Sequence, residues 1–294
     1  MRREPEWFVA QMHISMTISR AWLSLALVFV AASATAEPGV VTLVEGGARL
    51  LRGATWYKLV VGTRVEEADI IEASDRAQAQ VELAAGSRIN LVGPGTIYLV
   101  PSSPKAASGV LAMPMGWLKL AAKPPGIRIR TPLFDCVAGD GVLVVHATGH
   151  AVEFFGESGS AKLIELAANG TDGATRDVKS GEFGSKSVAS ALAVGQRAPK
   201  SFIDAMPRHF ADPLPALAER IKAKPALVVD HEITYAEAEP WLAGRDRAAF
   251  EKRFATRLRD PAFRSAALPN IARYPMWDRM LNPEKYAPKG EPAR

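Results

Sequence analysis

The sequence predicts a mainly β protein: a multi-stranded, twisted antiparallel β domain followed by a small α-helical C-terminal unit. Three observations predict this fold class. From residue 40 to about residue 183, short alternating or β-branched runs recur, separated by Gly, Pro, Ser and Asp. Beyond Val194, prolines become frequent and helix-start signals appear. The composition, 48% hydrophobic and 23% charged, excludes disordered, collagen-like and polytopic membrane chains.

The first element is an N-terminal export signal. Residues 21–32 form an apolar run without charge, and small residues ending Ala34-Thr35-Ala36 follow it. This pattern is typical of a secretory signal peptide. The apolar run is about a dozen residues long, whereas a spanning helix needs roughly 20, so cleavage after Ala36 is favoured over anchoring. We expect residues 1–36 to be removed and the mature chain to carry no transmembrane helix. The candidate start residues are Met1, Met12 and Met16.

The second element, residues 37–194, is predicted to be the β domain. Residues 78–83 and 127–130 alternate most cleanly, as in strands with one buried and one solvated face. Ala85-Gly86-Ser87 and Gly93-Pro94-Gly95 are predicted to be hairpin turns. A sandwich, a barrel and a twisted stack all fit this pattern. The strand candidates in chain order are residues 40–44, 48–51, 56–61, 70–71, 77–83, 88–91, 97–100, 117–120, 127–130, 142–146, 152–155 and 162–166.

The third element, residues 195–294, is predicted to be the helical C-terminal unit with a polar tail. Thr234 and Glu237 stand at the spacing of a capping box, which starts a helix that Pro240 must end or kink. Asp260 followed by Pro261 is an N-cap with proline in the first turn. The predicted helices are residues 214–224, 235–242, 247–258 and one that begins at Asp260.

A series of glycine-punctuated segments runs through the β domain in a recognisable order. The segments are residues 62–65, 68–71, 77–91, 95–99, 116–120, 129–132, 138–145, 152–157 and 178–183. In this order they resemble the FecR-like domain of bacterial periplasmic proteins. The resemblance implies a periplasmic, non-enzymatic β module; the founding members relay a signal from an outer-membrane transporter to a cytoplasmic sigma factor.

Those members differ from this chain ahead of the β domain. They carry a cytoplasmic anti-sigma region and a spanning helix there, whereas here we expect only the signal peptide. We therefore do not expect direct control of a sigma factor. The helical C-terminal unit lies outside the resemblance, and its role does not follow from it.

Candidate chemical motifs are few. His146 and His150 flank a turn and could share a metal, but zinc needs three or four ligands and no third is evident. We interpret them as solvent-facing hairpin residues. Residues 156–160 lack the second glycine of a nucleophile elbow and are predicted to be a hairpin turn. His231-Glu232 lacks a second histidine at zincin spacing and is predicted to be loop.

The single cysteine and the charge balance point to no redox or nucleic-acid chemistry. Cys136 lies in an apolar stretch and is predicted to be a buried small hydrophobe. The chain carries 36 Lys and Arg against 31 Asp and Glu, without a run dense enough to bind nucleic acid. The arginine-rich residues 247–264 could meet anionic lipid or a cell-wall polymer, although a solvated helix face is the default interpretation. The aromatic residues of the C-terminal unit are predicted to form its core. They are Trp241, Phe250, Phe254, Phe263 and Trp277.

We therefore predict an exported, non-enzymatic binding protein of the periplasm, acting in signalling or envelope assembly, with a protein partner or a cell-envelope polymer. No catalytic, cofactor-binding or metal-binding set is predicted, and no cofactor. The alternative is a hydrolase of an envelope polymer that uses Glu237 and Glu239. Because these two glutamates are two residues apart, they point to different faces of a helix and are poorly placed to act together.

Overall fold

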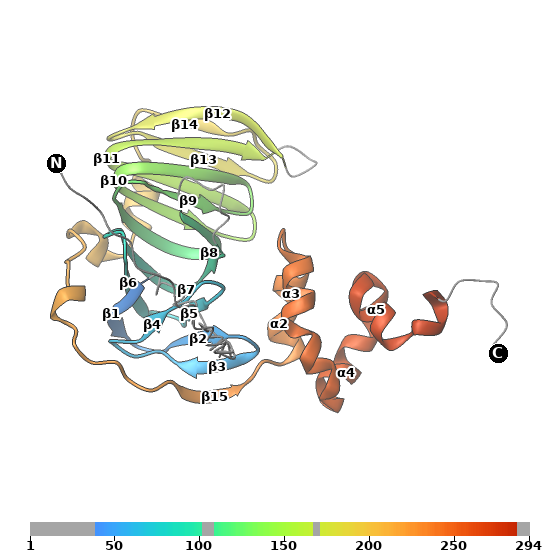
Figure 1. Ribbon diagram of the computed structural model, residues 1–294. Coiled ribbons are helices and arrows are strands. Elements are labelled where there is room, and N and C mark those ends of the chain that lie inside the picture. The colour runs from blue at the N-terminus through green and yellow to red at the C-terminus, as the bar shows by residue number, and fades with distance from the viewer. Residues whose placement is uncertain (1–38, 102–108, 167–170, 287–294) are drawn as a thin grey trace, which may run out of the picture. The chain divides into compact units, whose positions relative to one another are not determined.

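The computed structural model describes residues 39–101, 109–166 and 171–286, so the predicted signal peptide lies outside the described residues. The predicted fold class is confirmed: the chain is mainly β, with one large mixed sheet and short C-terminal helices (Figure 1). Every strand pair is antiparallel except β8–β9.

The strands are β1 (Gly39–Glu45), β2 (Ala48–Arg52), β3 (Thr55–Lys58), β4 (Arg64–Val65), β5 (Ile70–Ala73), β6 (Gln78–Leu83), β7 (Arg88–Val100), β8 (Gly109–Ala122), β9 (Ile127–Arg130), β10 (Phe134–Ala147), β11 (Ala151–Leu166), β12 (Asp172–Lys179), β13 (Phe183–Ser187), β14 (Ala193–Gly195) and β15 (Val228–Glu232). The helices are α1 (Lys200–Ala205), α2 (Tyr235–Leu242), α3 (Arg247–Phe254), α4 (Pro261–Ala267) and α5 (Pro275–Leu281). Short 3-10 helices are η1 (Arg208–Ala211), η2 (Ala218–Arg220), η3 (Ala255–Arg259), η4 (Leu268–Arg273) and η5 (Pro283–Tyr286).

Glycines bend the long strands instead of ending them. Gly93-Pro94-Gly95 lies inside β7, and residues 156–160 lie inside β11, so both predicted hairpin turns are wrong. A side chain on Gly116 of β8 would place its Cβ 2.5 Å from the Cα of Gly95, and its φ is +110°. Glycine is needed there because the two bent strands pass closely. The turn predicted at Gly86 is confirmed, with φ +84° between β6 and β7.

Because of these bends, one strand pairs with different neighbouring strands along its length. In β10, residues 135–138 pair with β9 while residues 141–147 pair with β8. In β7, residues 88–92 pair with β6 while residues 95–98 pair with β5. Consequently the sheet curls around an inner core of alternating apolar residues. Cys136 is fully buried in this core, as predicted, and burial raises the pKa of its thiol.

The segment between β14 and β15 crosses the outer face of the sheet. Phe202 of α1 and Phe210 of η1 are buried there against Val144. The ammonium of Lys119, only 1% exposed, donates to the Phe210 carbonyl and pairs with Glu157 at 2.8 Å. This buried lysine therefore fastens the segment to the sheet.

Further along, the segment stays extended, and the helix predicted over residues 214–224 is wrong apart from the single 3-10 turn of η2. Two backbone N–H groups, those of Leu217 and Ala218, instead donate to the carboxylate of Glu82 on β6. These two donors are thus used by the sheet, and Pro225 disfavours helical backbone at the residue before it. β15 follows and pairs with β3, so the loop predicted at His231-Glu232 is a strand (Figure 1).

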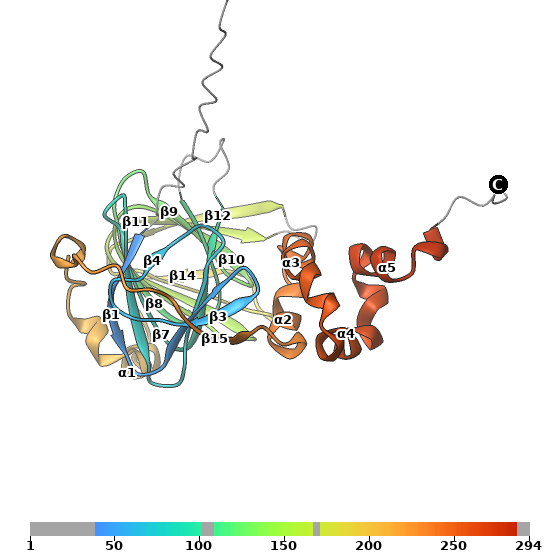
Figure 2. The same cartoon turned by 60° about the horizontal axis from the view of Figure 1, so that its bottom comes forward.

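β15 leads into the helices, which follow the local signals closely (Figure 2). The capping box of Thr234 and Glu237 is complete, and α2 continues two residues beyond Pro240. The Asp260 side chain caps α4 by accepting from the Phe263 N–H at 2.8 Å. The helix predicted over residues 247–258 is α3 followed by the 3-10 turn of η3. Among the described residues, no helix is long and apolar enough to cross a membrane.

An aromatic core joins these helices to the sheet. Four of the five aromatic residues predicted for the core are at most 3% exposed, whereas Trp241 is only partly buried. The sheet contributes Leu51, Trp56, Ile70 and Tyr98 to the same cluster. Each fully buried large side chain stabilises the fold by roughly 1.5–3 kcal/mol, so the sheet and the helices depend on each other.

Candidate functional site

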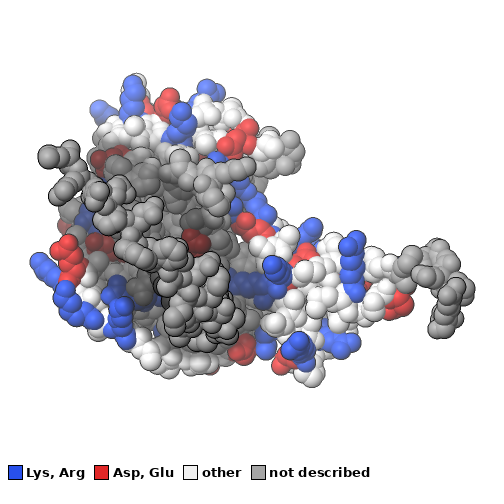
Figure 3. Space-filling model, viewed as in Figure 1, with Lys and Arg blue, Asp and Glu red and all other residues white. Residues whose placement is uncertain are grey.

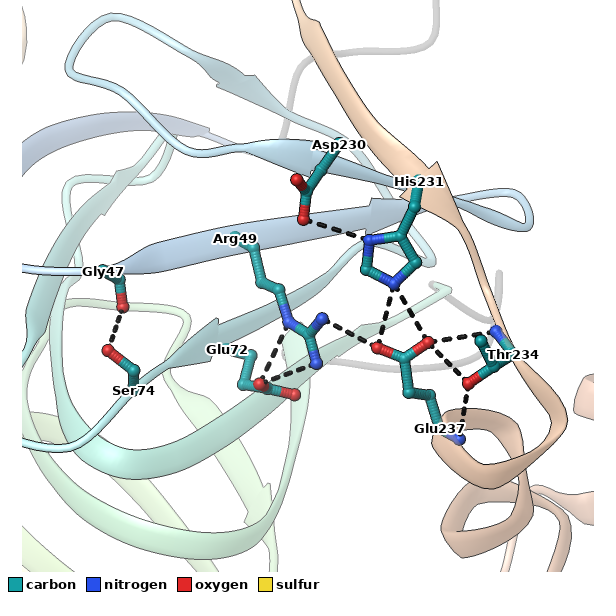
Figure 4. A network of polar contacts seen from close by, with 8 residues as sticks. All are labelled: Gly47, Arg49, Glu72, Ser74, Asp230, His231, Thr234 and Glu237. Atoms are coloured by element: carbon teal, nitrogen blue, oxygen red, sulfur yellow. Dashed lines mark hydrogen bonds and ion pairs between the residues drawn. The ribbon is translucent and has the colours of Figure 1, made fainter.

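Glu237, one of the two carboxylates of the hydrolase alternative, lies at the junction of α2, β2 and β15 (Figure 4). One of its oxygens accepts from the Thr234 N–H and hydroxyl at 3.0 and 2.8 Å. The other is 2.7 Å from the guanidinium of Arg49, and the His231 Nε2 is 3.1 Å from both oxygens. Arg49 also pairs with Glu72 on β5 at 3.0 Å. Glu237 is therefore held by side chains and backbone from the helix start and from two strands.

This network fixes the charge of Glu237. Burial raises the pKa of its carboxyl, but the hydrogen bonds from Thr234, His231 and Arg49 outweigh burial and lower the pKa to about 2. At neutral pH the carboxyl is thus ionised and cannot donate a proton as a general acid. Glu239 is bonded differently, by the Tyr235 hydroxyl at 3.4 Å. The network therefore joins the start of α2 to the sheet, and we call it the clamp.

The two histidines considered for a metal have separate surroundings. His146 stacks on Trp117 with ring centroids 4.0 Å apart, and its Nδ1 is 3.0 Å from Glu153. His150 lies exposed in the turn between β10 and β11. Within residues 39–101, 109–166 and 171–286, no group of three or more His, Cys, Asp or Glu side chains is placed to hold a metal ion.

The arginine-rich residues 247–264 divide into two sets, which corrects the prediction of a solvated face. Arg253 points toward the sheet and donates to the carbonyls of Gly53, Ala68 and Leu51 at 2.5, 2.5 and 2.9 Å. Arg257 donates to another backbone carbonyl, just before α2. These two arginines hold α3 and η3 against the sheet and are not available to a ligand.

Other arginines line an open groove along α3. A cavity of about 320 Å³ is lined by prolines, Trp241, Phe250, Arg130 and Arg245. A second cavity, of about 650 Å³, shares Arg245 with the first. A third, of about 520 Å³, shares Arg247 with the second. We call these three adjoining cavities the arginine groove. Its lining arginines are Arg130, Arg245, Arg247, Arg273 and Arg279, and its lining acids are Glu239, Asp246 and Glu251.

Ion pairs to the sheet fix the loop between α2 and α3, which forms one wall of the groove. Arg245 pairs with the fully buried Asp135 of β10 at 2.7 Å, and Asp135 also pairs with Arg128. The next residue, Asp246, pairs with Arg130 of β9. Because each strand contributes one partner, the loop cannot shift without breaking partly buried ion pairs.

The surface around the groove carries both signs of charge. In the view of Figure 3, Lys and Arg side chains are spread over both the sheet and the helices, with Asp and Glu side chains between them. Two groove arginines, Arg273 and Arg279, are exposed and have no ion-pair partner among the described residues. Asp246 and Glu251 are paired with arginines, so within the described part of the chain the lining contains two arginines without an ion pair against one such carboxylate, that of Glu239.

Sequence reasoning found part of this groove. Arg247 belongs to the arginine-rich span singled out above, but Arg130, Arg245, Arg273 and Arg279 lie outside it. A local signal is present in the run Gly244-Arg245-Asp246-Arg247, where charged residues follow a helix end. Which of these side chains face one groove depends on how α2, α3 and α5 pack, and the sequence pattern does not specify that packing.

Comparison with known proteins gives limited similarity. No family model matches the sequence, and no curated protein matches it. Two crystal structures of a protein from Parabacteroides distasonis, provisionally described as an anti-sigma factor, share 13% and 12% identity with it. Each comparison has a TM-score of 0.38 and covers 44% of this chain and 59% of the other. The chain thus spans less than two thirds of the length of these proteins.

Proposed function

We propose that the chain is an exported, non-enzymatic binding module of the periplasm that acts in signalling or envelope assembly. The observation that supports this proposal is the arginine groove, a concave surface of several hundred Å³ whose wall is tied to the sheet. Clefts of this size that carry a few fixed polar groups are typical ligand sites. The state of Glu237, ionised and bonded to Thr234, His231 and Arg49, favours binding over hydrolysis.

Export and the FecR-like resemblance belong to the same proposal. The apolar run and small residues before Glu37 support cleavage after Ala36. The order of glycine-punctuated segments in the β domain supports a periplasmic β module. Protein purified from the periplasm should begin at Glu37, and a protein recovered from the cytoplasm with residues 1–36 intact would contradict the proposal.

The binding role is tested with the whole mature chain, residues 37–294. A truncated chain ending near Val194 is unsuitable because it would uncover the side chains of Leu51, Trp56, Ile70 and Tyr98. We expect the immobilised mature chain to retain a component of envelope extract in a saturable, reversible manner. Purified envelope polymers incubated with the chain should release no new chain ends.

The matched variants Glu237→Gln and Glu239→Gln separate binding from hydrolysis. We expect Glu237→Gln, whose side chain lies outside the groove, to retain the envelope component as the wild type does, provided that it is folded by circular dichroism. Glu239 lines the groove, so folded Glu239→Gln should retain the component at least as well, because the change removes a negative charge from the binding surface. Release of polymer fragments by the wild type, abolished in the folded Glu239→Gln variant, would overturn the proposal and establish the hydrolase alternative.

A further inference from the structure

We propose that the arginine groove binds a linear polysaccharide whose sugar rings carry carboxylates. This inference rests on the proposed binding function and names its ligand class. Four features of the groove carry it: its free guanidinium groups, its length, the tryptophan at one end and the small residues along its floor.

The free guanidinium groups favour a carboxylated ligand. Arg273 and Arg279 have no ion-pair partner among the described residues. The Arg279 guanidinium lies over the Tyr286 ring, 5.3 Å from its centroid, a contact that leaves its N–H donors for a ligand. Arg247 pairs through its Nε, at 3.2 Å from the buried Glu251, which leaves its outer nitrogens for a ligand. Guanidinium groups bind carboxylates through two parallel hydrogen bonds, which makes arginine the preferred residue for such ligands.

The groove is extended and open, which suits a polymer. Its three cavities follow one another along α3, from Trp241 at one end to Met280 at the other. Arg245 stands between the first and second cavities, and Arg247 between the second and third. Arginines at successive positions along a groove match a ligand that repeats its negative charge.

Trp241 provides a rigid apolar surface at the first cavity. Its ring packs against Phe250 with centroids 5.0 Å apart and against Tyr98 at 6.0 Å. Pro114 and Pro132 complete the apolar lining. A partly exposed indole held in place by other rings offers a flat face at little entropic cost, which suits the apolar face of a sugar ring.

The floor of the groove distinguishes a saccharide from an acidic peptide. Between the arginines, the second cavity is lined by small residues and by the one carboxylate of Glu239, against the three arginines Arg245, Arg247 and Arg273. The small residues are Ala236, Ala243, Gly244 and Ala248. These small side chains leave a smooth surface without a deep apolar pocket. Peptide segments that bind in grooves bury large apolar anchors or extend a sheet edge, and this part of the groove offers neither.

The experiment is a calorimetric titration of the full mature chain with hexagalacturonate, and with maltohexaose as the neutral sugar of equal length. The groove variant is Arg273→Gln with Arg279→Gln. The control variant is Arg259→Gln with Arg264→Gln, which removes the same charge from exposed positions outside the groove. We expect the groove variant to lose about tenfold or more in affinity and the control to lose less than about threefold.

Three results would overturn the inference. These are equal binding of maltohexaose, equal weakening by the groove and control variants, and tighter groove-dependent binding of a hexaglutamate peptide than of hexagalacturonate. If hexagalacturonate does not bind while the chain still retains its envelope component, the ligand class is wrong and the proposed function stands. If the chain neither binds hexagalacturonate nor retains an envelope component, the proposed function itself is contradicted.

Discussion

Replacing Glu237 by glutamine tests the clamp between α2 and the sheet. Glutamine keeps the size of the side chain, but it removes the charge that Arg49 and His231 face and turns one acceptor into a donor. The carboxyl has a pKa of about 2 in the folded chain against an ordinary value of 4.5. This difference corresponds to about 3 kcal/mol of unfolding free energy at pH 7, which the variant should lose.

The stabilisation by the Glu237 carboxylate should depend on pH in a defined way. Since the folded pKa is lowered, the stabilisation is complete above pH 4.5 and disappears as the pH falls toward 2. At pH 3 the same relation leaves about 1.5 kcal/mol. Urea unfolding followed by tryptophan fluorescence at pH 7 and pH 3 should therefore show the gap between wild type and variant shrinking by about half.

Glu239→Gln is the matched control, because Glu239 lies in the same helix and, among the residues that the structure describes, its carboxylate accepts only the long hydrogen bond from the Tyr235 side chain. We expect this variant to lose less than about 0.5 kcal/mol of unfolding free energy at either pH. The reasoning would be refuted if the difference in unfolding free energy between the wild type and Glu237→Gln were equal at both pH values. A loss for Glu239→Gln as large as that for Glu237→Gln would also refute it.

Three further predictions concern other parts of the chain. Lys119→Met removes the buried ammonium that donates to the carbonyl of Phe210, so it should lower the free energy of unfolding by about 2 kcal/mol. It should also speed limited proteolysis between residues 196 and 214, and an unchanged cleavage rate would contradict this prediction. Arg253→Lys cannot span three carbonyls and should also cost about 2 kcal/mol in urea unfolding, whereas Lys252→Ala, exposed on the same helix, should stay within about 0.5 kcal/mol. Cys136, fully buried with a raised thiol pKa, should resist a thiol reagent in the folded chain and react once urea unfolds it; rapid labelling of the native chain would show that the core opens.

The parts of the fold that the sequence predicts well are those decided within a few residues. The caps at Thr234 and Asp260 satisfy backbone donors one turn away, and both helices begin where predicted. Alternation also locates most strands up to β11, although the predicted runs 88–91 and 97–100 are a single strand and β4, β12, β13 and β14 are not predicted. The turn prediction at Gly93 to Gly95 is wrong because glycine serves equally in a turn and at a close approach of strands, and only the partner strand distinguishes the two.

The candidate site is harder to predict because its residues are brought together by packing. Arg253 and Arg247 lie on one short helix, yet the first is directed into sheet carbonyls about 200 residues earlier in the chain and the second lines the groove. β15 escapes prediction for a similar reason. Its polar second half gives no alternation, and its place depends on pairing with β3.

The groove depends on the sheet although helices and their connections form most of its wall. Asp135, buried in β10, holds Arg245, and Arg130 of β9 holds the adjacent Asp246. The buried aromatic core beneath the helices includes Tyr98 of β7. Because these ion pairs and the core are shared, a change in β9 or β10 alters the position of the groove wall through Arg130 and Asp135. Asp135→Asn should therefore weaken hexagalacturonate binding without touching the ligand, while Arg245→Gln should weaken it by a similar factor and the two losses should not add.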